Sequence, residues 1–428
     1  MKHLLVVEDN RIAGSLISTK VSSVLPVTIH WAQTMAEAMV LLEEHEDKFD
    51  AALLDYVLPD AQDGEVISEV VARNIPSIVF TGNVISDKER KRLWQKNIVD
   101  YVVKDDPQSL DYLTFLLTRL DKNPTIKILI VDDSKFFRIV LGRLLRVHRY
   151  HVLEAVDGES ALEVLNDNPD VKLVITDYQM PRMDGFTFIK RLRKRHGRES
   201  MAVLGMAGER DRNMGARFIK CGANDFISKK SFITEELYCR VNQNLESIER
   251  IQTIRRLATT DSLTGLYNRR YFYETATHIV ATCKRSKTRV ACAMIDVDRF
   301  KKINDTWGHQ VGDVALQHIS TILAKYFKRS SDLVARMGGE EFCVLANDIT
   351  REQAKSRFDA VRRLIESSAF KVSETKKHQV TVSIGLCTEL GENLDAMLRK
   401  ADALLYEAKE DGRNRVVTDF ITLETNEG

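Results

Sequence analysis

The chain has 428 residues, with 63 Lys and Arg residues against 62 Asp and Glu residues. This balance excludes a protein that binds nucleic acid or a membrane surface through bulk positive charge. The length predicts about three domains. The cysteines are scattered singly without metal-binding spacing, as is typical of reduced thiols. The first apolar stretch is too short for a signal peptide and no run approaches transmembrane length. We therefore expect a cytoplasmic protein that does not insert into a membrane.

The N-terminal half contains two loose copies of one pattern. Residues 4–9 return as 128–133, residues 54–59 as 176–181, and residues 101–104 as 226–229. So long a repeat predicts two tandem domains rather than a solenoid. Within each copy, short apolar strands alternate with amphipathic helical stretches, which predicts βα units around a parallel sheet.

Each copy places an acid pair after its first strand, one Asp after its third and a Lys after its fifth. These residues are Glu8, Asp9, Asp55 and Lys104 in the first copy, and Asp132, Asp133, Asp177 and Lys229 in the second. The carboxyl ends of parallel strands meet at one edge of a sheet, so each acidic trio should hold a divalent cation. With its charge neutralised, Asp55 or Asp177 could accept a phosphoryl group. A dinucleotide-binding domain is disfavoured because no GxGxxG follows either first strand.

This arrangement resembles the receiver domain of two-component response regulators. The resemblance implies flavodoxin-like (βα)5 domains at residues 1–122 and 125–240, and a histidine kinase or phosphotransfer protein as phosphodonor. Receivers couple a hydroxyl at the end of the fourth strand to an aromatic switch residue. The first copy has Thr81 and Tyr101, whereas the second has Ala207 and Phe226. We therefore expect Asp55 to be the main signalling site, and Asp177 to be phosphorylated with a weak switch.

A helix is predicted across residues 232–258, which lack Gly and Pro and carry apolar residues every three or four positions. Residues 241–260 would form a helical linker to the next domain. A surface helix packed on its own domain and a dimeric coiled coil both fit the pattern. Either would transmit a rearrangement better than a flexible loop.

The C-terminal part carries carboxylates at two predicted strand ends. An apolar run at residues 290–295 ends in Asp296, and Gly338, Gly339, Glu340 and Glu341 lie between two apolar runs. The second pattern predicts a β-hairpin with adjacent acids at its tip. An acidic turn without function fits those four residues alone. Glycines beside carboxylates also suit a phosphate ester with a bound hard cation.

A last amphipathic helix is predicted at residues 401–409, closed by Gly412 and followed by Arg413 and Asn414. Lys409 and Arg413 are four residues apart, close to one helical turn, and we expect them to project the same way. They would supply two cations for phosphate groups.

Several ordered motifs between about residues 255 and 420 together resemble the GGDEF-domain diguanylate cyclases. They lie at residues 261–270, 296, 300–301, 304–305, 308–309, 312–313, 338–342 and 412–414. The resemblance implies an α/β cyclase domain at residues 261–428. It implies condensation of two GTP molecules into cyclic di-GMP and two pyrophosphates, in a homodimer with one GTP on each domain.

The resemblance also assigns roles to single residues. Asp296, the Val297 carbonyl and Glu340 would bind Mg²⁺ or Mn²⁺, and Glu340 beside Glu341 would be the catalytic base. Asn304 and Asp313 would read guanine, Gly338 and Gly339 would admit the ribose and phosphates, and Lys409 and Arg413 would hold the outer phosphates. His309 is either a substrate contact or a structural residue at a helix end.

Arg329 and Asp332 form an RxxD pattern that binds product in this family. Six strand residues, roughly 20 Å, would separate Asp332 from Gly338, so a ligand there would act allosterically. The alternative function is a silent GGDEF domain that senses GTP or cyclic di-GMP. It is disfavoured because the signature carboxylates and phosphate cations are all present. A transcriptional regulator is disfavoured because no helix-turn-helix pattern follows the receiver-like copies.

Overall fold

The computed structural model describes residues 1–45, 48–82, 87–104, 108–208, 213–230, 232–329, 331–372 and 376–420. It divides into two compact units, Met1–Gln252 and Thr253–Gly428. Each unit is described by itself. No helix in the described ranges combines the length and apolar character needed to cross a membrane.

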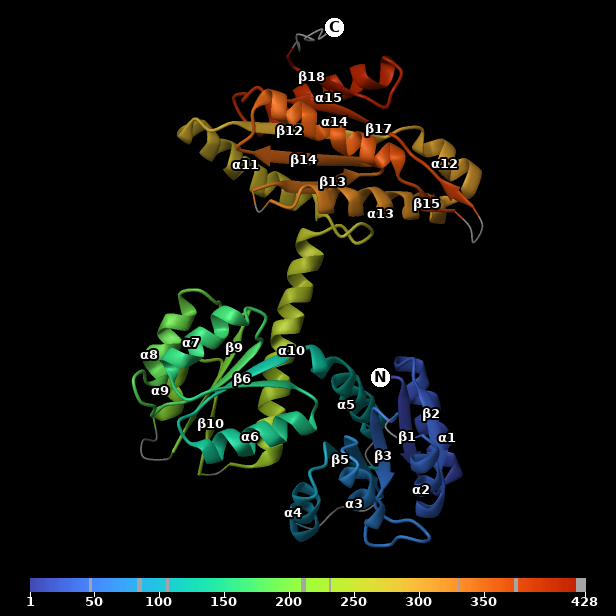
Figure 1. The fold of residues 1–428 in the computed structure, drawn as a ribbon, viewed down its shortest axis with the longest axis vertical. Coiled ribbons are helices and arrows are strands. Elements are labelled where there is room, and N and C mark those ends of the chain that lie inside the picture. Colours follow the sequence, from blue (N-terminus) through green and yellow to red (C-terminus); the bar gives the residue numbers. More distant parts are fainter. Residues whose placement is uncertain are drawn as a thin grey trace. The chain divides into compact units, whose positions relative to one another are not determined.

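The first unit begins with a parallel five-stranded sheet of order β2-β1-β3-β4-β5 (Figure 1). Its strands are β1 His3–Val7, β2 Thr28–Ala32, β3 Ala51–Asp55, β4 Ser77–Thr81 and β5 Asp100–Val103. Its helices are α1 Arg11–Val24, α2 Met35–Glu44, α3 Glu65–Ala72, α4 Asp87–Gln95 and α5 Ser109–Lys122. Along β1, Leu4 and Val6 enter one apolar core and Leu5 and Val7 the other. Helices therefore cover both faces, and the polar strand ends lie at one edge.

The same unit contains a second parallel sheet of order β10-β9-β8-β6-β7. Its strands are β6 Lys127–Val131, β7 His151–Ala155, β8 Leu173–Asp177, β9 Ala202–Ala207 and β10 Asp225–Ser228. Its helices are α6 Lys135–Val147, α7 Gly158–Asp167, α8 Gly185–Arg193, α9 Met214–Cys221 and α10 Thr234–Thr259, and a short 3₁₀ turn at Asn123–Thr125 precedes β6. Both sheets have the connectivity 2-1-3-4-5, which confirms the predicted flavodoxin-like fold.

Helix α10 is continuous, as its apolar spacing predicted. Its first half belongs to the second α/β domain, where Leu237, Val241 and Leu245 are buried. Farther along, the apolar residues Ile254 and Leu257 are each 66% exposed. The exposed stretch has the spacing of a helix-packing face, but too few turns to define a coiled coil by itself.

The second unit holds a mixed six-stranded sheet of order β11-β13-β14-β12-β17-β18, with β12 at its centre (Figure 1). Its strands are β11 Tyr267–Asn268, β12 Val290–Val297, β13 Leu333–Gly338, β14 Glu341–Asn347, β17 Val382–Cys387 and β18 Val416–Thr418. Its helices are α11 Arg269–Ser286, α12 Phe300–Trp307, α13 His309–Tyr326, α14 Arg351–Ser367 and α15 Leu394–Glu410. A separate small ribbon pairs β15 Phe370–Lys371 with β16 Lys377–His378.

The two faces of this sheet receive alternate residues of β12. Ala291, Ala293, Ile295 and Val297 pack in the core that contains α13 and α14, and Val290, Cys292 and Met294 pack in the core that contains α11 and α15. This is the two-residue period of a strand buried on both sides. By the same period, Asp296 belongs to the α15 face, together with Ser383, which pairs with it on β17.

Helix α15 lies directly against β17 because residue 385 has no side chain. A Cβ on Gly385 would overlap the backbone of Ala401 and Leu405. The close approach brings the C-terminal end of α15 to the end of β12, where the polar residues of the domain gather.

Candidate functional sites

The end of β12 and the β13–β14 hairpin form one corner of the C-terminal domain. Asp296 pairs in register with Glu341, and the Val297 N–H donates to the Glu340 carbonyl at 3.4 Å. Gly338 and Gly339 have φ values of +145° and +51°, and a Cβ on either would meet open space. The predicted hairpin with an acidic tip is therefore confirmed. Its glycines are needed for the backbone conformation, and they leave the approach to the acids open.

Asp296 is the electrostatic centre of this corner. Burial raises the pKa of its carboxyl, Lys409 Nζ at 2.8 Å lowers it, and Glu340 and Glu341 raise it again. A buried acid beside two further carboxylates and one lysine has an excess of negative charge. The available donors are carboxylate oxygens and the Val297 carbonyl, which are the ligands that Mg²⁺ and Mn²⁺ prefer. These residues fit a divalent cation.

Arg336 anchors the signature turn, a role that the sequence reasoning missed. Its Nε and Nη2 donate to the Gly339 carbonyl at 2.9 and 2.7 Å, and its Nη1 donates to Asp261 at 3.1 Å. Asp261 also accepts from the Thr264 N–H at 2.9 Å. The one signal in the sequence was an arginine inside an otherwise apolar strand.

The predicted guanine-reading residues lie on two neighbouring helices. Asn304 is on α12, and Asp313 is an exposed residue in the first turns of α13, which begins at His309. Asn304 Oδ1 is shielded from solvent and has no hydrogen-bond partner among the described residues. It rests against Gly312, where a Cβ would overlap it. A shielded, unpaired amide oxygen is suited to accept from a bound ligand.

Lys409 and Arg413 have different surroundings in the structure. Helix α15 ends at Glu410, and Arg413 follows Gly412 with a φ of +68°. Gly412 has a φ of +106°, in the left-handed region, and ends the helix as predicted. Lys409 binds Asp296, whereas Arg413 lines a cavity of about 510 Å³ together with Arg299 and Lys302.

The predicted product site contains a residue from another helix. Asp332 accepts from Arg357 on α14 at 2.6 and 3.4 Å, and Arg357 lies over the Phe327 ring at 4.6 Å. Arg329 is exposed, and Ser330 between them lies outside the described residues. Strand β13 separates Asp332 from the signature turn, as predicted. Nothing in the local spacing pointed to Arg357, because the contact depends on how α14 packs.

Each α/β domain brings its acidic trio together. Ligand oxygens of Glu8, Asp9 and Asp55 lie within 4.8 Å of one another, as do those of Asp132, Asp133 and Asp177. Both sets are oxygen donors that fit a hard divalent cation.

The lysine predicted for each trio binds two of its members. Lys104 Nζ lies 2.5 Å from Asp55 and 2.7 Å from Glu8. In the second domain, Lys229 Nζ lies 2.7 Å from Asp132 and 2.9 Å from Asp177. Burial raises the carboxyl pKa of Glu8 and of Asp177, and the lysine in each domain partly offsets the shift.

The two candidate switch residues have different surroundings. Tyr101 meets Trp94 of α4 edge-on at 6.3 Å, and Trp94 Nε1 donates to Glu235 of α10 at 3.1 Å. In the second domain Phe226 packs on Phe218 at 5.4 Å inside its own core. The aromatic residue of the first domain therefore contacts a tryptophan that binds α10, whereas that of the second contacts a phenylalanine of its own core.

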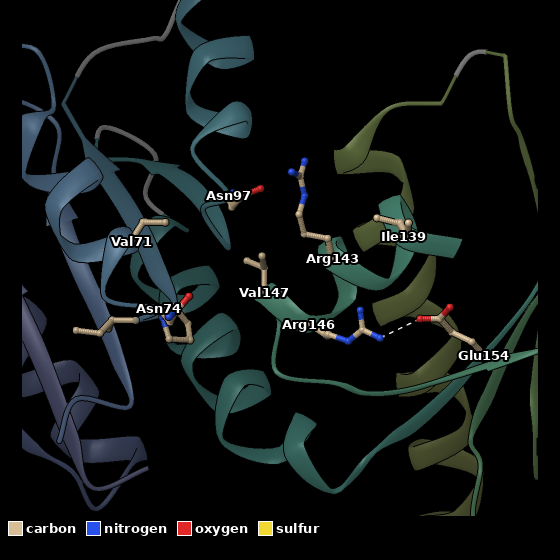
Figure 2. A pocket seen from close by; sticks show the side chains of 10 residues that line it. Val71, Asn74, Asn97, Ile139, Arg143, Arg146, Val147 and Glu154 are labelled. Carbon is tan, nitrogen blue, oxygen red and sulfur yellow. Dashed lines mark hydrogen bonds and ion pairs between the residues drawn. The ribbon is translucent and has the colours of Figure 1, made fainter. Parts of the chain in front are cut away.

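A cavity of about 480 Å³ lies between the two α/β domains of the first unit (Figure 2). Val71 and Asn74 line it from one domain, and Ile139 and Arg143 line it from α6 of the other. Arg146 and Glu154 also line it and form an ion pair of 3.0 Å. None of the acidic trio residues is part of its lining, so it is separate from the candidate phosphorylation sites.

Comparison with known proteins assigns families to two parts of the chain. Residues 128–242 match the response regulator receiver domain, and residues 258–415 match the family described as diguanylate cyclase, GGDEF domain. The chain is 34% identical to the response regulator PleD of Caulobacter vibrioides over 301 residues, which is 68% of this chain and 65% of PleD. It thus spans just under two thirds of that relative's length. It is also 37% identical over 166 residues to diguanylate cyclase A of Treponema denticola, covering 37% of this chain and 44% of that protein.

One solved structure matches more than one domain of this chain. A two-component system response regulator/GGDEF domain protein is 34% identical, with a TM-score of 0.53, and the match covers 58% of this chain and 100% of that one. The receiver match, the GGDEF match and this shared two-domain arrangement agree with the geometry of both sites. The chain therefore belongs to the response regulators that carry a GGDEF domain.

Proposed function

We propose that the protein is a diguanylate cyclase that condenses two GTP molecules into cyclic di-GMP and two pyrophosphates. The observation that carries the proposal is the corner at which Asp296 meets the Gly338–Gly339–Glu340–Glu341 turn and binds Lys409. It combines oxygen ligands for a divalent cation, a cation for phosphate and glycines that leave room for a nucleotide. The diguanylate cyclases among the relatives support this reading.

The residues of this corner divide the chemistry between them. Glu340 takes the proton from the ribose 3′-hydroxyl of one GTP, whose oxygen bonds to the α-phosphorus of the other GTP. The bond from that phosphorus to the bridging oxygen breaks, and pyrophosphate leaves. Asp296, the Val297 carbonyl and Glu340 hold Mg²⁺ or Mn²⁺, which lowers the pKa of the attacking hydroxyl when bound. Lys409 and Arg413 bind the leaving phosphates.

The guanine base fits between α12 and α13. Asp313 accepts from guanine N1–H and the 2-amino group, and Asn304 completes the contact with its amide. Adenine offers neither donor on that edge, so this pair selects GTP. His309 is the first residue of α13 and lies near Asp313 in the sequence. We assign it a contact with the substrate.

Activity requires two copies of the chain. Each GGDEF domain binds one GTP, and the two bound molecules must face each other for each 3′-hydroxyl to meet the other α-phosphate. A two-fold homodimer solves this proximity problem. We propose that the helix at residues 241–260 helps to align the two cyclase domains.

The first α/β domain is proposed to be a second receiver, so that receivers occupy residues 1–122 and 125–240 and the cyclase domain occupies 261–428. Its acidic trio and Lys104 reproduce the arrangement in the matched receiver. A histidine kinase or phosphotransfer protein phosphorylates Asp55, and Asp177 is the secondary site. The Thr81–Tyr101 pair couples phosphorylation of Asp55 to the rest of the cytoplasmic protein.

Product inhibition is assigned to Arg329 and Asp332, with Arg357 as a third member. The cluster offers two guanidinium groups outside the catalytic corner, which suits the phosphates and guanine edges of cyclic di-GMP. Replacing Arg329 with Ala should raise the product concentration that gives half-inhibition. An unchanged inhibition curve would remove Arg329 from the site.

The proposed activity is tested with the full chain, labelled GTP and Mg²⁺, by separating and identifying the products. The wild type should form cyclic di-GMP, and Asp296→Asn and Glu340→Gln should each lower turnover by about 100-fold or more. Asp402→Asn, an exposed change on α15, is the matched control. A wild type that binds cyclic di-GMP but leaves GTP intact would establish the silent sensor instead.

A further inference from the structure

Asp298 lies two residues beyond Asp296, just past the end of β12. The two carboxylates are similarly buried, with Asp296 6% and Asp298 8% exposed. Asp296 binds Lys409 of α15, whereas Asp298 binds Ser383 of β17 and the loop after α15. One strand end therefore carries two buried carboxylates with different surroundings.

The Asp298 carboxylate is held by neutral donors. Its Oδ1 accepts from Ser383 Oγ at 2.6 Å, and its Oδ2 accepts from Thr381 Oγ1 at 2.7 Å and from the Asn414 N–H at 3.1 Å. Its own N–H donates to the Thr381 carbonyl at 3.0 Å. No ion pair joins it to a cation in the described ranges. A buried carboxylate with several hydrogen bonds fixes its partners strongly.

One of those partners belongs to the loop that carries Arg413. Arg413 and Asn414 have φ values of +68° and +48°, which is an unfavourable conformation for two successive residues with side chains. The Asn414 side chain is clamped from the other side, because Arg362 donates to its Oδ1 at 2.8 Å and its Nδ2 donates to Glu366 at 2.7 Å. Asp298 and α14 together hold this strained turn.

The position of Arg413 depends on that turn. Among the described residues, its guanidinium has no hydrogen bond or ion pair, and it lines the 510 Å³ cavity beside Arg299 and Lys302. A side chain without its own anchor is placed by its backbone. The Arg413 N–H donates to the Ala408 carbonyl at 3.0 Å, and the next N–H in the chain is the one that Asp298 accepts.

We propose that Asp298 is a positioning residue that places Arg413 against the outer phosphates of the nucleotide. The inference rests on the proposed cyclase function and extends it. The end of β12 then builds both halves of the triphosphate site. Asp296 holds the cation corner, and Asp298 holds the loop that carries the phosphate arginine.

A double-mutant cycle with Asp298→Asn and Arg413→Ala tests the proposal in the full chain. Each single change should lower kcat/KM for GTP by about tenfold. The double variant should be within about twofold of Arg413→Ala, because Asp298 acts through the arginine. Asp402→Asn should match the wild type. Losses that multiply in the double variant would overturn the proposal.

Nucleotide binding supplies a readout that general loss of structure would not give. Asp298→Asn should weaken binding of GTP about tenfold and leave binding of GMP unchanged, because GMP lacks the outer phosphates. Equal weakening of both nucleotides would contradict the assignment. Wild-type chain that forms no cyclic di-GMP would instead overturn the proposed function and leave the binding comparison standing.

Thermal unfolding of each variant shows whether the domain is still folded. Should Asp298→Asn fail to fold, Arg362→Met loosens the same turn from the α14 side. That change should reproduce the selective loss of GTP binding and should also fail to add to Arg413→Ala. Multiplying losses in that pair would count equally against the role of the turn.

Discussion

At the scale of single residues, strand-end carboxylates in all three domains meet a lysine. Lys104, Lys229 and Lys409 lie between 2.5 and 2.9 Å from Asp55, Asp177 and Asp296. Burial raises the carboxyl pKa of Asp177 and Asp296, and the lysine beside each favours the charged form that binds a cation. Asp298 has no such lysine, which agrees with a role in holding backbone rather than metal.

The guanine pocket depends on a residue without a side chain. Gly312→Ala should displace Asn304, because the new Cβ would occupy the place of its Oδ1. Loss of one base contact should raise KM for GTP about tenfold and narrow the preference for GTP over ATP. Steady-state kinetics with both nucleotides check this, and Gly391→Ala in a partly exposed loop of the same domain is the control. Unchanged KM and selectivity would show that Asn304 does not read the base.

The buried ring of His148 should make the stability of the first unit depend on pH. Its ring lies against Tyr238 at a centroid distance of 3.7 Å, and burial lowers its pKa from 6.5 to about 3. The unfolded chain therefore takes up this proton below pH 6.5, while the folded chain stays neutral until about pH 3. The stability that the neutral ring provides is complete above pH 6.5 and falls as the pH drops toward 3.

Comparison with a variant isolates this effect. Burial raises the pKa of Asp100 to about 6. Its contribution to the unfolding free energy therefore rises as the pH drops below 6, which is opposite to the contribution of His148. The difference in unfolding free energy between the wild type and His148→Gln should shrink by about 1.4 kcal/mol from pH 7.5 to pH 5.5. Urea unfolding at both pH values measures it, with His151→Gln at an exposed position as the control. A difference that does not change with pH would show that His148 titrates normally in the folded protein.

At the scale of elements, the β13–β14 hairpin is held from outside the hairpin as well as by its own ladder. Arg336 ties the Gly339 carbonyl to Asp261, in the segment that directly follows α10. The Asn268 side chain donates back to the Ala258 carbonyl in α10 at 2.9 Å. The end of the helix is thus connected to the turn that carries Glu340 through hydrogen bonds and one ion pair.

Arg336→Lys should loosen this turn while keeping the charge. A lysine has one nitrogen in place of the three that bind Gly339 and Asp261, so it cannot reproduce this planar fork of donors. We expect kcat to fall about tenfold or more with a smaller change in KM, since the base moves rather than the binding surface. Kinetics of Arg270→Lys, an exposed arginine on α11, provide the comparison. Equal rates for Arg336→Lys and wild type would mean that the turn holds its shape without the arginine.

The sequence was most informative where function depends on local order. Alternating apolar strands, their terminal acids and the glycine turn predicted the sheets, the hairpin and both acidic trios. It failed where a contact depends on packing between elements. Arg357 reaches Asp332 from α14, and Arg336 reaches Asp261 from β13. Neither contact follows from the periodicity of a single element.

At the scale of the whole molecule, the two α/β domains differ in how they could report phosphorylation. The first has the hydroxyl of Thr81, and its Tyr101 lies beside Trp94, which contacts Glu235 of α10. The second has Ala207 at the equivalent strand end, and Phe226 is packed in its own core. The aromatic position of the first domain therefore offers Asp55 a route to α10, whereas the second domain lacks the hydroxyl that would couple Asp177 to Phe226.

Beryllium fluoride, which mimics a phosphoryl group on Asp, should raise cyclase turnover of the wild type about fivefold or more. Asp55→Asn should remove most of that increase, and Asp177→Asn should retain most of it. The dimer fraction, measured by light scattering on the same samples, should follow the turnover. Activation that survives Asp55→Asn and disappears in Asp177→Asn would reverse the order of the two sites.

The account depends most on a divalent cation bound at the end of β12 beside a triphosphate. Crystals of the protein with a non-hydrolysable GTP analogue and Mn²⁺ test this directly, since manganese is located by its anomalous scattering. We predict a manganese peak in contact with Asp296, the Val297 carbonyl and Glu340, next to the phosphates. Nucleotide bound elsewhere, or a peak distant from Asp296 and Glu340, would contradict the cyclase mechanism.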